Sequence, residues 1–168
     1  MTTKFTPLLM LLLCILLTGC TKSDNTDKLA TYRELMSIHA GRIGELRIQL
    51  SEIDIHSESS TIECLDILNE MDEVFQDIAS LDIPKEFIAV ESLAVESSQY
   101  MTESVVAYEA LFSTIPYDEY SAQLAEESYN RAMKRQYYIG EILQGKVPSG
   151  DDITTVVEDD SESNSVSE

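Results

Sequence analysis

Apolar residues recur at alternating spacings of three and four along four stretches of the chain, which is the pattern of amphipathic helices. These stretches cover residues 29–53, 64–78, 84–112 and 116–143. Heptad spacing within them is typical of helices that pack in coiled-coil fashion. Strict alternation of apolar and polar residues, which is typical of strands, is brief everywhere. The pattern therefore predicts four helices and no sheet.

Helix start and stop signals fall between these stretches. Pro84 and Pro116 suit the first turn of a helix, where a missing N–H costs nothing. Ser60 and Glu63 resemble a capping box and predict the start of the second helix. Gly145 is expected to end the fourth helix, because glycine is favoured just past a helix C-terminus. The connections between the helices are therefore expected to be short.

Short connections make consecutive helices antiparallel neighbours. We therefore expect an all-α fold, in which residues 27–146 form an antiparallel up-down bundle of four long helices. A three-helix bundle with a broken or splayed first helix is the main alternative. Gly41 and Gly44 lie within the first helical pattern and predict a bend or a close backbone approach. His39 continues the apolar stripe of that helix, so we expect it to be buried.

The charge of the chain is strongly acidic. The 168 residues include 31 Asp and Glu against 11 Lys and Arg, and the formal net charge is −20. This balance excludes a nucleic-acid binder that works through a basic face. Fifteen acids and one base fall between residues 51 and 112, so the second and third helices are expected to form a negative face. Such a face either binds cations or a basic partner, or only keeps the domain soluble.

The bases lie mostly on the first and fourth helices, which are expected to share a mildly basic edge. Residues 149–168 contain seven acids, no base and many serines. A segment of this composition cannot bury enough apolar surface to order itself. We therefore expect residues 147–168 to form a disordered acidic tail.

The N-terminal segment differs from the rest of the chain. An apolar run at residues 8–17 is too short to span a bilayer and has the length of a signal-peptide core. The run closes at Leu17-Thr18-Gly19-Cys20. This motif resembles the lipobox of prokaryotic lipoproteins, in which an aliphatic residue and two small residues precede a cysteine.

The resemblance implies that the Cys20 thiol is linked to a diacylglycerol and that the peptide is cut before this residue. Residues 1–19 are then a signal peptide, and residues 20–26 are a short tether between the lipid and the bundle. The mature chain is expected on the outer side of the cytoplasmic membrane, or at the outer membrane in a Gram-negative cell. An uncleaved N-terminal anchor with an incidental cysteine is the alternative.

The three cysteines have separate fates under this interpretation. Cys14 leaves with the signal peptide, and Cys20 carries lipid. Cys64 then remains alone, so the mature chain has no intrachain disulfide. The apolar neighbours Ile62 and Leu65 predict that Cys64 is a small, buried apolar side chain.

Residues suited to catalysis are sparse. The chain has two histidines, His39 and His56, and no HExxH, GxSxG, CxxC or phosphate-binding glycine loop. The sequence therefore predicts no enzyme and no cofactor. Asp54, His56 and Glu58 share one connection and are retained only as an alternative site for a divalent metal ion.

Tyrosine is concentrated at the fourth helix, which holds five of the eight. Because Tyr offers a large contact area and a hydroxyl group, these side chains are candidates to line a cleft for an amphipathic ligand or partner helix. Packing in the core and at its boundary is the alternative. The candidate ligand-facing residues are Tyr117, Tyr120, Tyr129, Tyr137 and Tyr138.

Together these features favour a lipid-anchored interaction module without catalytic activity over a ligand- or metal-binding bundle. The organisation resembles that of small helical envelope lipoproteins, including the helix start at Ile83-Pro84-Lys85-Glu86-Phe87. The resemblance implies two partners, the membrane through the lipid on Cys20 and an envelope protein. The sequence leaves the oligomeric state open.

Overall fold

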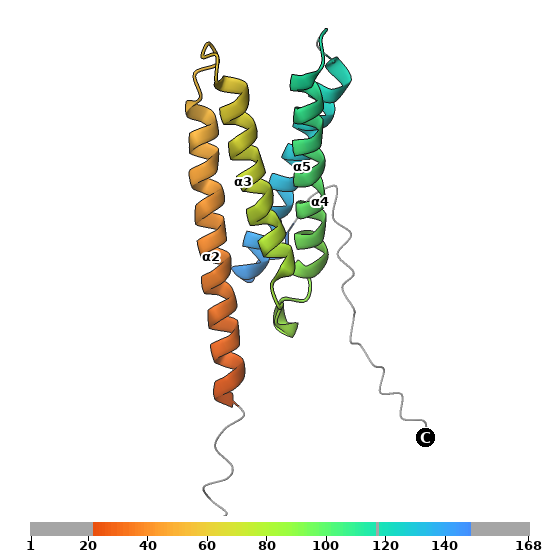
Figure 1. Cartoon of the computed structure of the whole chain (residues 1–168). Coiled ribbons are helices and arrows are strands. Elements are labelled where there is room, and N and C mark those ends of the chain that lie inside the picture. The colour runs from red at the N-terminus through yellow and green to blue at the C-terminus, as the bar shows by residue number, and fades with distance from the viewer. Residues whose placement is uncertain (1–21, 117, 149–168) are drawn as a thin grey trace, which may run out of the picture.

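The computed structural model describes residues 22–116 and 118–148, and all regular elements in this part of the chain are helical (Figure 1). The helices alternate in direction. α3 lies beside α2, and α5 packs closely along α4. The predicted all-α, up-down bundle is therefore confirmed, whereas the predicted tail lies almost wholly outside the described residues. The elements are α2 (Lys22–Glu52), α3 (Ser60–Ser80), the short 3-10 helix η1 (Lys85–Phe87), α4 (Val90–Ser113) and α5 (Glu119–Leu143).

The first helix begins earlier than the sequence pattern predicts. α2 starts at Lys22, so the part of the predicted tether at residues 22–26 is helical. No Gly or Pro occurs between residues 22 and 40, and adding a residue to an existing helix is much easier than nucleating one. The bundle is therefore joined to residue 20 by a helix and not by an irregular linker of the predicted length.

Two helix starts are displaced from their predicted positions. The residue that precedes α3 is Ser59, and its hydroxyl donates to the Glu63 carboxylate. The predicted capping box on Ser60 is therefore wrong. α5 begins after Asp118, whose carboxylate accepts hydrogen bonds from the backbone N–H groups of Tyr120 and Ser121. An Asp side chain satisfies these unpaired N–H groups directly, which proline cannot do.

Pro84 also stands outside an α-helix. It precedes the 3-10 turn η1, and α4 begins only at Val90. Phe87 of this turn is buried and stacks on Tyr32 of α2, with 5.7 Å between the ring centroids. The turn therefore serves to insert an aromatic side chain that joins α2 to the α3–α4 connection.

One apolar cluster joins all four helices. Most of its members come from the predicted heptad stripes, with Leu93 and Tyr138 as additions, and its interior is closed to solvent, with Leu46, Met71, Phe75 and Ile78 completely buried. Burying a side chain of this size stabilises the fold by roughly 2 kcal/mol. The cluster comprises Tyr32, Met36, Ile43, Leu46, Met71, Val74, Phe75, Ile78, Phe87, Val90, Leu93, Ala94, Met101, Ala132, Tyr138 and Ile139.

Small residues allow α4 and α5 to approach closely. Ser104 is completely buried, and its hydroxyl donates to the Ala125 carbonyl oxygen at 2.8 Å. Ser128 donates to a Glu103 carboxylate oxygen at 2.7 Å. These hydrogen bonds satisfy polar groups that are otherwise costly to bury, so they fix the register of the two helices.

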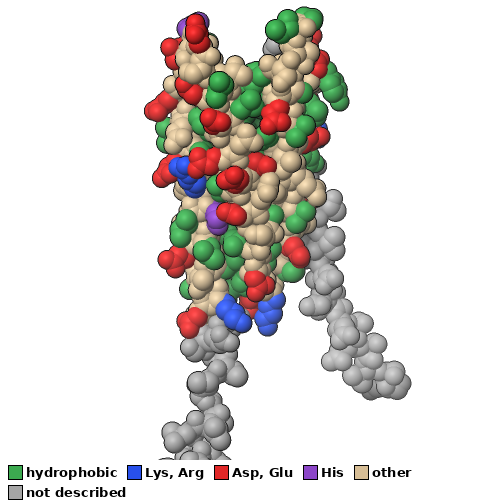
Figure 2. All heavy atoms as spheres, in the orientation of Figure 1, with side chains coloured by type: hydrophobic (Ala, Val, Ile, Leu, Met, Phe, Trp, Pro, Cys, Tyr) green, Lys and Arg blue, Asp and Glu red, His purple; other side chains and the backbone are tan. Residues whose placement is uncertain are grey.

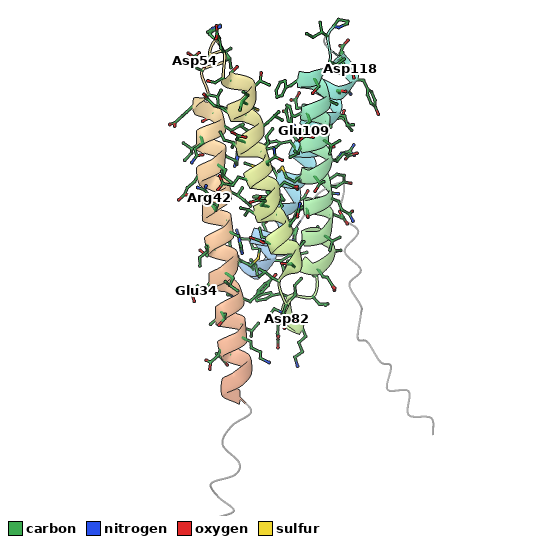
Figure 3. The ribbon with its side chains drawn as sticks, in the orientation of Figure 1. Glu34, Arg42, Asp54, Asp82, Glu109 and Asp118 are labelled. Carbon is green, nitrogen blue, oxygen red and sulfur yellow. The ribbon has the colours of Figure 1, made fainter. Side chains whose placement is uncertain are left out.

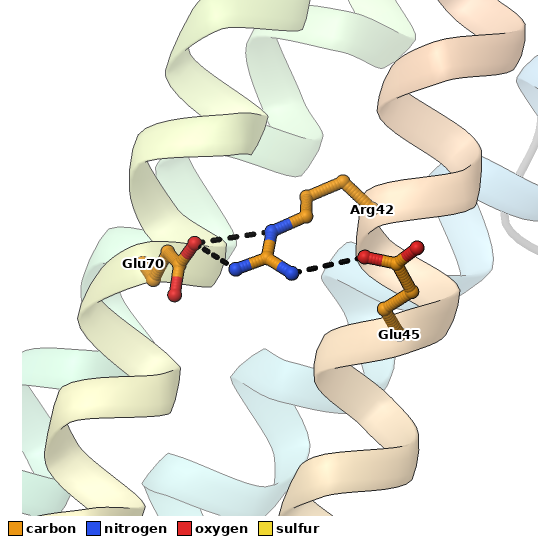
Figure 4. Close-up of polar contacts among 3 residues, drawn as sticks. All are labelled: Arg42, Glu45 and Glu70. Carbon is orange, nitrogen blue, oxygen red and sulfur yellow. Dashed lines mark hydrogen bonds and ion pairs between the residues drawn. The ribbon is translucent and has the colours of Figure 1, made fainter.

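Ion pairs connect α2 to α3 and α4 to α5. Figure 4 shows Arg42 of α2 donating to Glu70 of α3 and to Glu45 of its own helix, with Nε–Oε1 and Nη1–Oε2 distances of 3.0 and 2.9 Å. Arg135 of α5 is largely buried and donates to Glu96 of α4 at 3.0 Å. Arg42 and Arg135, two of the bases expected on the edge shared by α2 and α5, thus pair with acids on α3 and α4.

Two expectations for α2 are not met. His39 is only partly buried, so it lies at the boundary of the apolar stripe and not within the core. Gly41 and Gly44 lie within the uninterrupted helix, and a Cβ added at either position meets no atom within 4 Å. The close backbone approach predicted at these glycines is therefore absent.

Replacing Gly44 with Ala is expected to stabilise the bundle. The new methyl group meets open space, and Ala lowers the free energy of a helix interior by about 1 kcal/mol relative to Gly. Thermal unfolding followed by circular dichroism should give a higher midpoint. Gly145→Ala is the control, because φ of +76° at Gly145 strains any residue with a Cβ. Stabilisation by both substitutions would contradict this account.

Arg135→Ala is expected to lower the free energy of unfolding by about 2 kcal/mol, because a charged hydrogen bond from the largely buried Arg135 to the partly exposed Glu96 is lost. Urea titration measures this change. Arg131→Ala is the matched control on the same helix, since Arg131 is half-exposed and lies 3.6 Å from Glu127. An exposed pair of this kind contributes about 0.5 kcal/mol. Equal effects of the two substitutions would overturn the assignment.

Candidate functional site

The predicted tyrosine cluster does not form one surface. Tyr138 is buried in the core, Tyr129 is partly buried at its edge, and Tyr120 and Tyr137 are exposed to solvent. Tyr117 lies outside the described residues. None of the four hollows described below is lined by any of these four side chains. The predicted tyrosine-lined ligand cleft is therefore not formed by them.

Local contacts explain where these tyrosines lie. The Tyr137 hydroxyl donates to Glu141 at 3.1 Å, and this bond to a carboxylate raises the pKa of Tyr137. Burial raises the pKa of Tyr129, and the nearby Arg47 partly opposes that shift. Each hydroxyl thus has a partner on its own helix or on α2, which is typical of packing at the boundary of a core.

The connection between α2 and α3 is organised by its own backbone. Asp54 accepts a hydrogen bond from the His56 backbone N–H at 3.0 Å, and its carbonyl oxygen accepts one from Ser57 N–H at 2.9 Å. These bonds form a turn closed by an aspartate side chain. Within residues 22–116 and 118–148, no three His, Cys, Asp or Glu side chains are grouped to hold a metal ion. Asp54, His56 and Glu58 therefore do not supply a three-ligand site.

The lipidation candidate, Cys20, lies outside the described residues. α2 begins two residues after it. In the part of the chain that the structure describes, no helix combines the length and the apolar character that crossing a bilayer requires.

The structure shows an apolar cleft that the sequence pattern did not predict. We call it the distal cleft, because it lies at the end of the bundle opposite the N-terminus of α2, between the tips of the α2–α3 and α4–α5 pairs (Figure 2). Its volume is about 340 Å³, at the lower end of the range for ligand pockets. Its walls include Leu50, Ile53, Cys64, Leu68, Tyr108 and Phe112.

The cleft exists because the core divides at this end. The apolar cluster shared by all four helices reaches no further than Leu46, Met71 and Met101. Beyond that level, Leu68 is buried on α3 and Leu111 on α4, and neither belongs to the shared cluster. The two helix pairs are therefore no longer held together by common packing, and their inner faces form the cleft walls.

Aromatic packing shapes the α4 wall. The rings of Tyr108 and Phe112 stack with 5.8 Å between their centroids, and Phe112 remains 38% exposed. Cys64 faces them from α3, and burial raises the pKa of its thiol. The wall is thus apolar and still accessible to solvent, and the thiol is kept protonated at neutral pH.

Acidic side chains surround the cleft. Asp54, Glu109 and Asp118 lie at this end of the bundle, on both helix pairs (Figure 3). Glu63 and Asp66 line a shallow hollow that shares Ile53 with the cleft. The segments that build this end, 48–68 and 104–123, contain eight Asp and Glu, one His and no Lys or Arg.

Two other hollows are less distinctive. One, of about 610 Å³, runs along the outer side of α4 near Thr102 and Val106. The other, of about 520 Å³, lies between the start of α2 and the α3–α4 connection and includes Lys28, Tyr32 and Asp82. The first is lined by small and polar side chains with one acid, Glu103, and the second carries charges of both signs.

Comparisons of the chain with protein-family models, with curated proteins and with solved structures give no match.

Tyr32→Phe is expected to raise the free energy of unfolding by about 1 kcal/mol, because the buried Tyr32 hydroxyl has no hydrogen-bond partner among the described residues. Burial also raises the pKa of Tyr32. The folded state therefore holds this proton to higher pH than the unfolded state, so the parent loses stability as pH rises above about 10 and the advantage of Tyr32→Phe grows. Urea titration at pH 7 and above pH 10 measures both effects, and a destabilised variant at pH 7 would contradict them.

Proposed function

We propose that the protein is a lipid-anchored, extracytoplasmic interaction module that acts without catalysis. The observation that carries the proposal is Leu17-Thr18-Gly19-Cys20, placed directly after an apolar run of signal-peptide length. The two acyl chains of the thioether-linked diacylglycerol would hold the mature protein at the membrane, whereas a single acyl chain gives only marginal binding.

The position of α2 supports this proposal. The helix begins two residues after Cys20 and reaches the shared core at Tyr32, so about three helical turns would separate the lipid from the folded domain. The anchor is thus joined to the part of the bundle that packs best. The cleft lies at the other end of α2, which is about 45 Å long by its 31 residues.

The arrangement of charge also supports attachment at the N-terminal end. Lys28, Arg33 and Lys85 lie at or near this end, and the opposite end carries acids only, apart from His56. Asp27, Asp82 and Glu86 also lie at or near the first end, so its charges nearly cancel, and negative phospholipid headgroups repel it less than the second end. The bundle would therefore stand with its acidic tip and distal cleft away from the membrane.

Cys20→Ala tests the anchor. Cells grown with a radiolabelled or alkyne fatty acid should label the parent chain and not the variant, and the variant should accumulate as an uncut precursor because lipid attachment precedes cleavage. Cys14→Ala is the matched control, since this cysteine lies within the apolar run and should leave labelling unchanged. Lipid labelling of the Cys20→Ala chain would refute the proposed anchor.

A further inference from the structure

We propose that the distal cleft binds a cationic amphipathic helix of a partner protein. This inference rests on the proposed function and adds to it the site and the chemical class of the partner. It follows from three features at one end of the bundle. These are an open apolar cleft, exposed apolar residues at its mouth, and surrounding segments that contain Asp and Glu but no Lys or Arg.

The mouth of the cleft exposes apolar residues in places where connections are normally polar. Ile55 is 79% exposed in the α2–α3 connection, and Ile115 is 97% exposed in the α4–α5 connection. Ile62 on α3 is 64% exposed. Of the exposed apolar residues at this end, Ile55 and Phe112 line the cleft itself, so its apolar surface reaches solvent on both helix pairs. Exposed apolar surface that extends a hollow in this way marks an interaction site.

The shape of the cleft suits a helix. Its walls belong to α2 and α3 on one side and to α4 on the other, so it is an interrupted helix–helix interface. An amphipathic helix can place its apolar side chains at spacings of three and four into such a groove. Leu68, Tyr108 and Phe112 then pack on the guest helix as they would on a fifth helix of the bundle.

The charge selects a basic partner. Eight carboxylates and no Lys or Arg occur in the two segments that build this end. Opposite charge on the partner would speed its encounter with the cleft and would disfavour acidic competitors. A basic helix whose apolar face enters the cleft can also place its Lys and Arg side chains against Glu52, Glu58 and Glu109, which are exposed acids of these two segments and which we call the rim.

The chain's own C-terminal segment is a poorer occupant. Residues 153–157 are its most apolar stretch, and Ile153 is the fifth residue after Pro148, where the described chain ends past α5. Five extended residues span about 17 Å, whereas the 25 residues of α5 place the cleft about 37 Å away. The seven acids of residues 149–168 would also be repelled by the rim.

The same negative charge disfavours contact between the distal ends of two copies of the chain, and it disfavours contact of the distal end with the membrane. Two distal ends brought together would oppose eight carboxylates with eight, since no Lys or Arg is present there to compensate. Anionic headgroups would meet the same repulsion. A cationic helix is the occupant that satisfies the apolar cleft and the acidic rim together.

The test uses photo-crosslinking to the full chain, solubilised in a neutral detergent. The probe is a 14-residue amphipathic peptide of Leu and Lys that carries one benzophenone on its apolar face. Crosslinking should saturate with peptide concentration, and mass spectrometry should locate the crosslinks in residues 50–68 and 108–112. A peptide of the same composition in scrambled order, and a Leu–Glu peptide of the same pattern, should crosslink at least about tenfold more weakly.

Two pairs of variants separate the rim from the cleft. The combined change Glu52→Gln, Glu58→Gln and Glu109→Gln should raise the half-saturating concentration about tenfold, and added salt should reduce this difference. Its control is Glu34→Gln, Glu73→Gln and Glu91→Gln, which neutralises three exposed acids elsewhere and should change that concentration less than about twofold.

The second pair removes apolar contacts at exposed positions, where folding is little affected. Ile55→Ser with Phe112→Ser should weaken crosslinking about tenfold. Val95→Ser with Val106→Ser, on the outer side of α4, should leave it unchanged. Circular dichroism confirms that each variant keeps its helix content.

Three results would overturn the inference. These are crosslinks located along the outer side of α4, equal crosslinking by the Leu–Glu peptide, or crosslinks between two protein copies when benzophenone replaces Phe112. Lipid labelling of the same preparation separates this inference from the proposed anchor. Labelled protein that fails to bind the peptide refutes only the partner, and unlabelled protein refutes the anchor whatever the peptide does.

Discussion

The burial of one apolar cluster is the constraint on which the other features of the bundle depend. Leu46, Phe75 and Ile139 are closed to solvent within it and come from three different helices. α2 joins the cluster only along one stripe, and a lone helix with two internal glycines is marginal in water. The length over which this cluster is shared therefore decides where the bundle is closed and where its helix pairs separate.

The helices and their buried stripes could be predicted from the sequence, because spacing alone decides which residues share a helix face. Met36, Ile43 and Leu46 follow that rule. Helix starts were predicted less well, since several local groups compete for the same unpaired N–H groups. Ser59 precedes α3 in place of Ser60, and Asp118 caps α5 where Pro116 was expected. These choices depend on backbone geometry that a residue pattern does not specify.

The candidate site was predicted only in part. Tyr137 and Tyr138 are neighbours in sequence, yet one is exposed and the other buried, because burial depends on which helix covers each face. The distal cleft arises where two helix pairs stop sharing a core, and this property involves residues distant in sequence. One signal was nevertheless present. Ile55 and Ile115 are large apolar residues in connections, where solvation normally selects polar ones.

The early start of α2 has a consequence for how partners would be met. Its first turns project beyond the end of α3, so the domain stands on a helical stalk (Figure 1). A flexible tether of equal residue number lets a domain explore a hemisphere, whereas a helix keeps its length and direction. The open end would thus be confined to a thin layer parallel to the membrane. A partner anchored in the same membrane, with its basic helix at that height, would gain greatly in effective concentration, whereas a freely diffusing one would not.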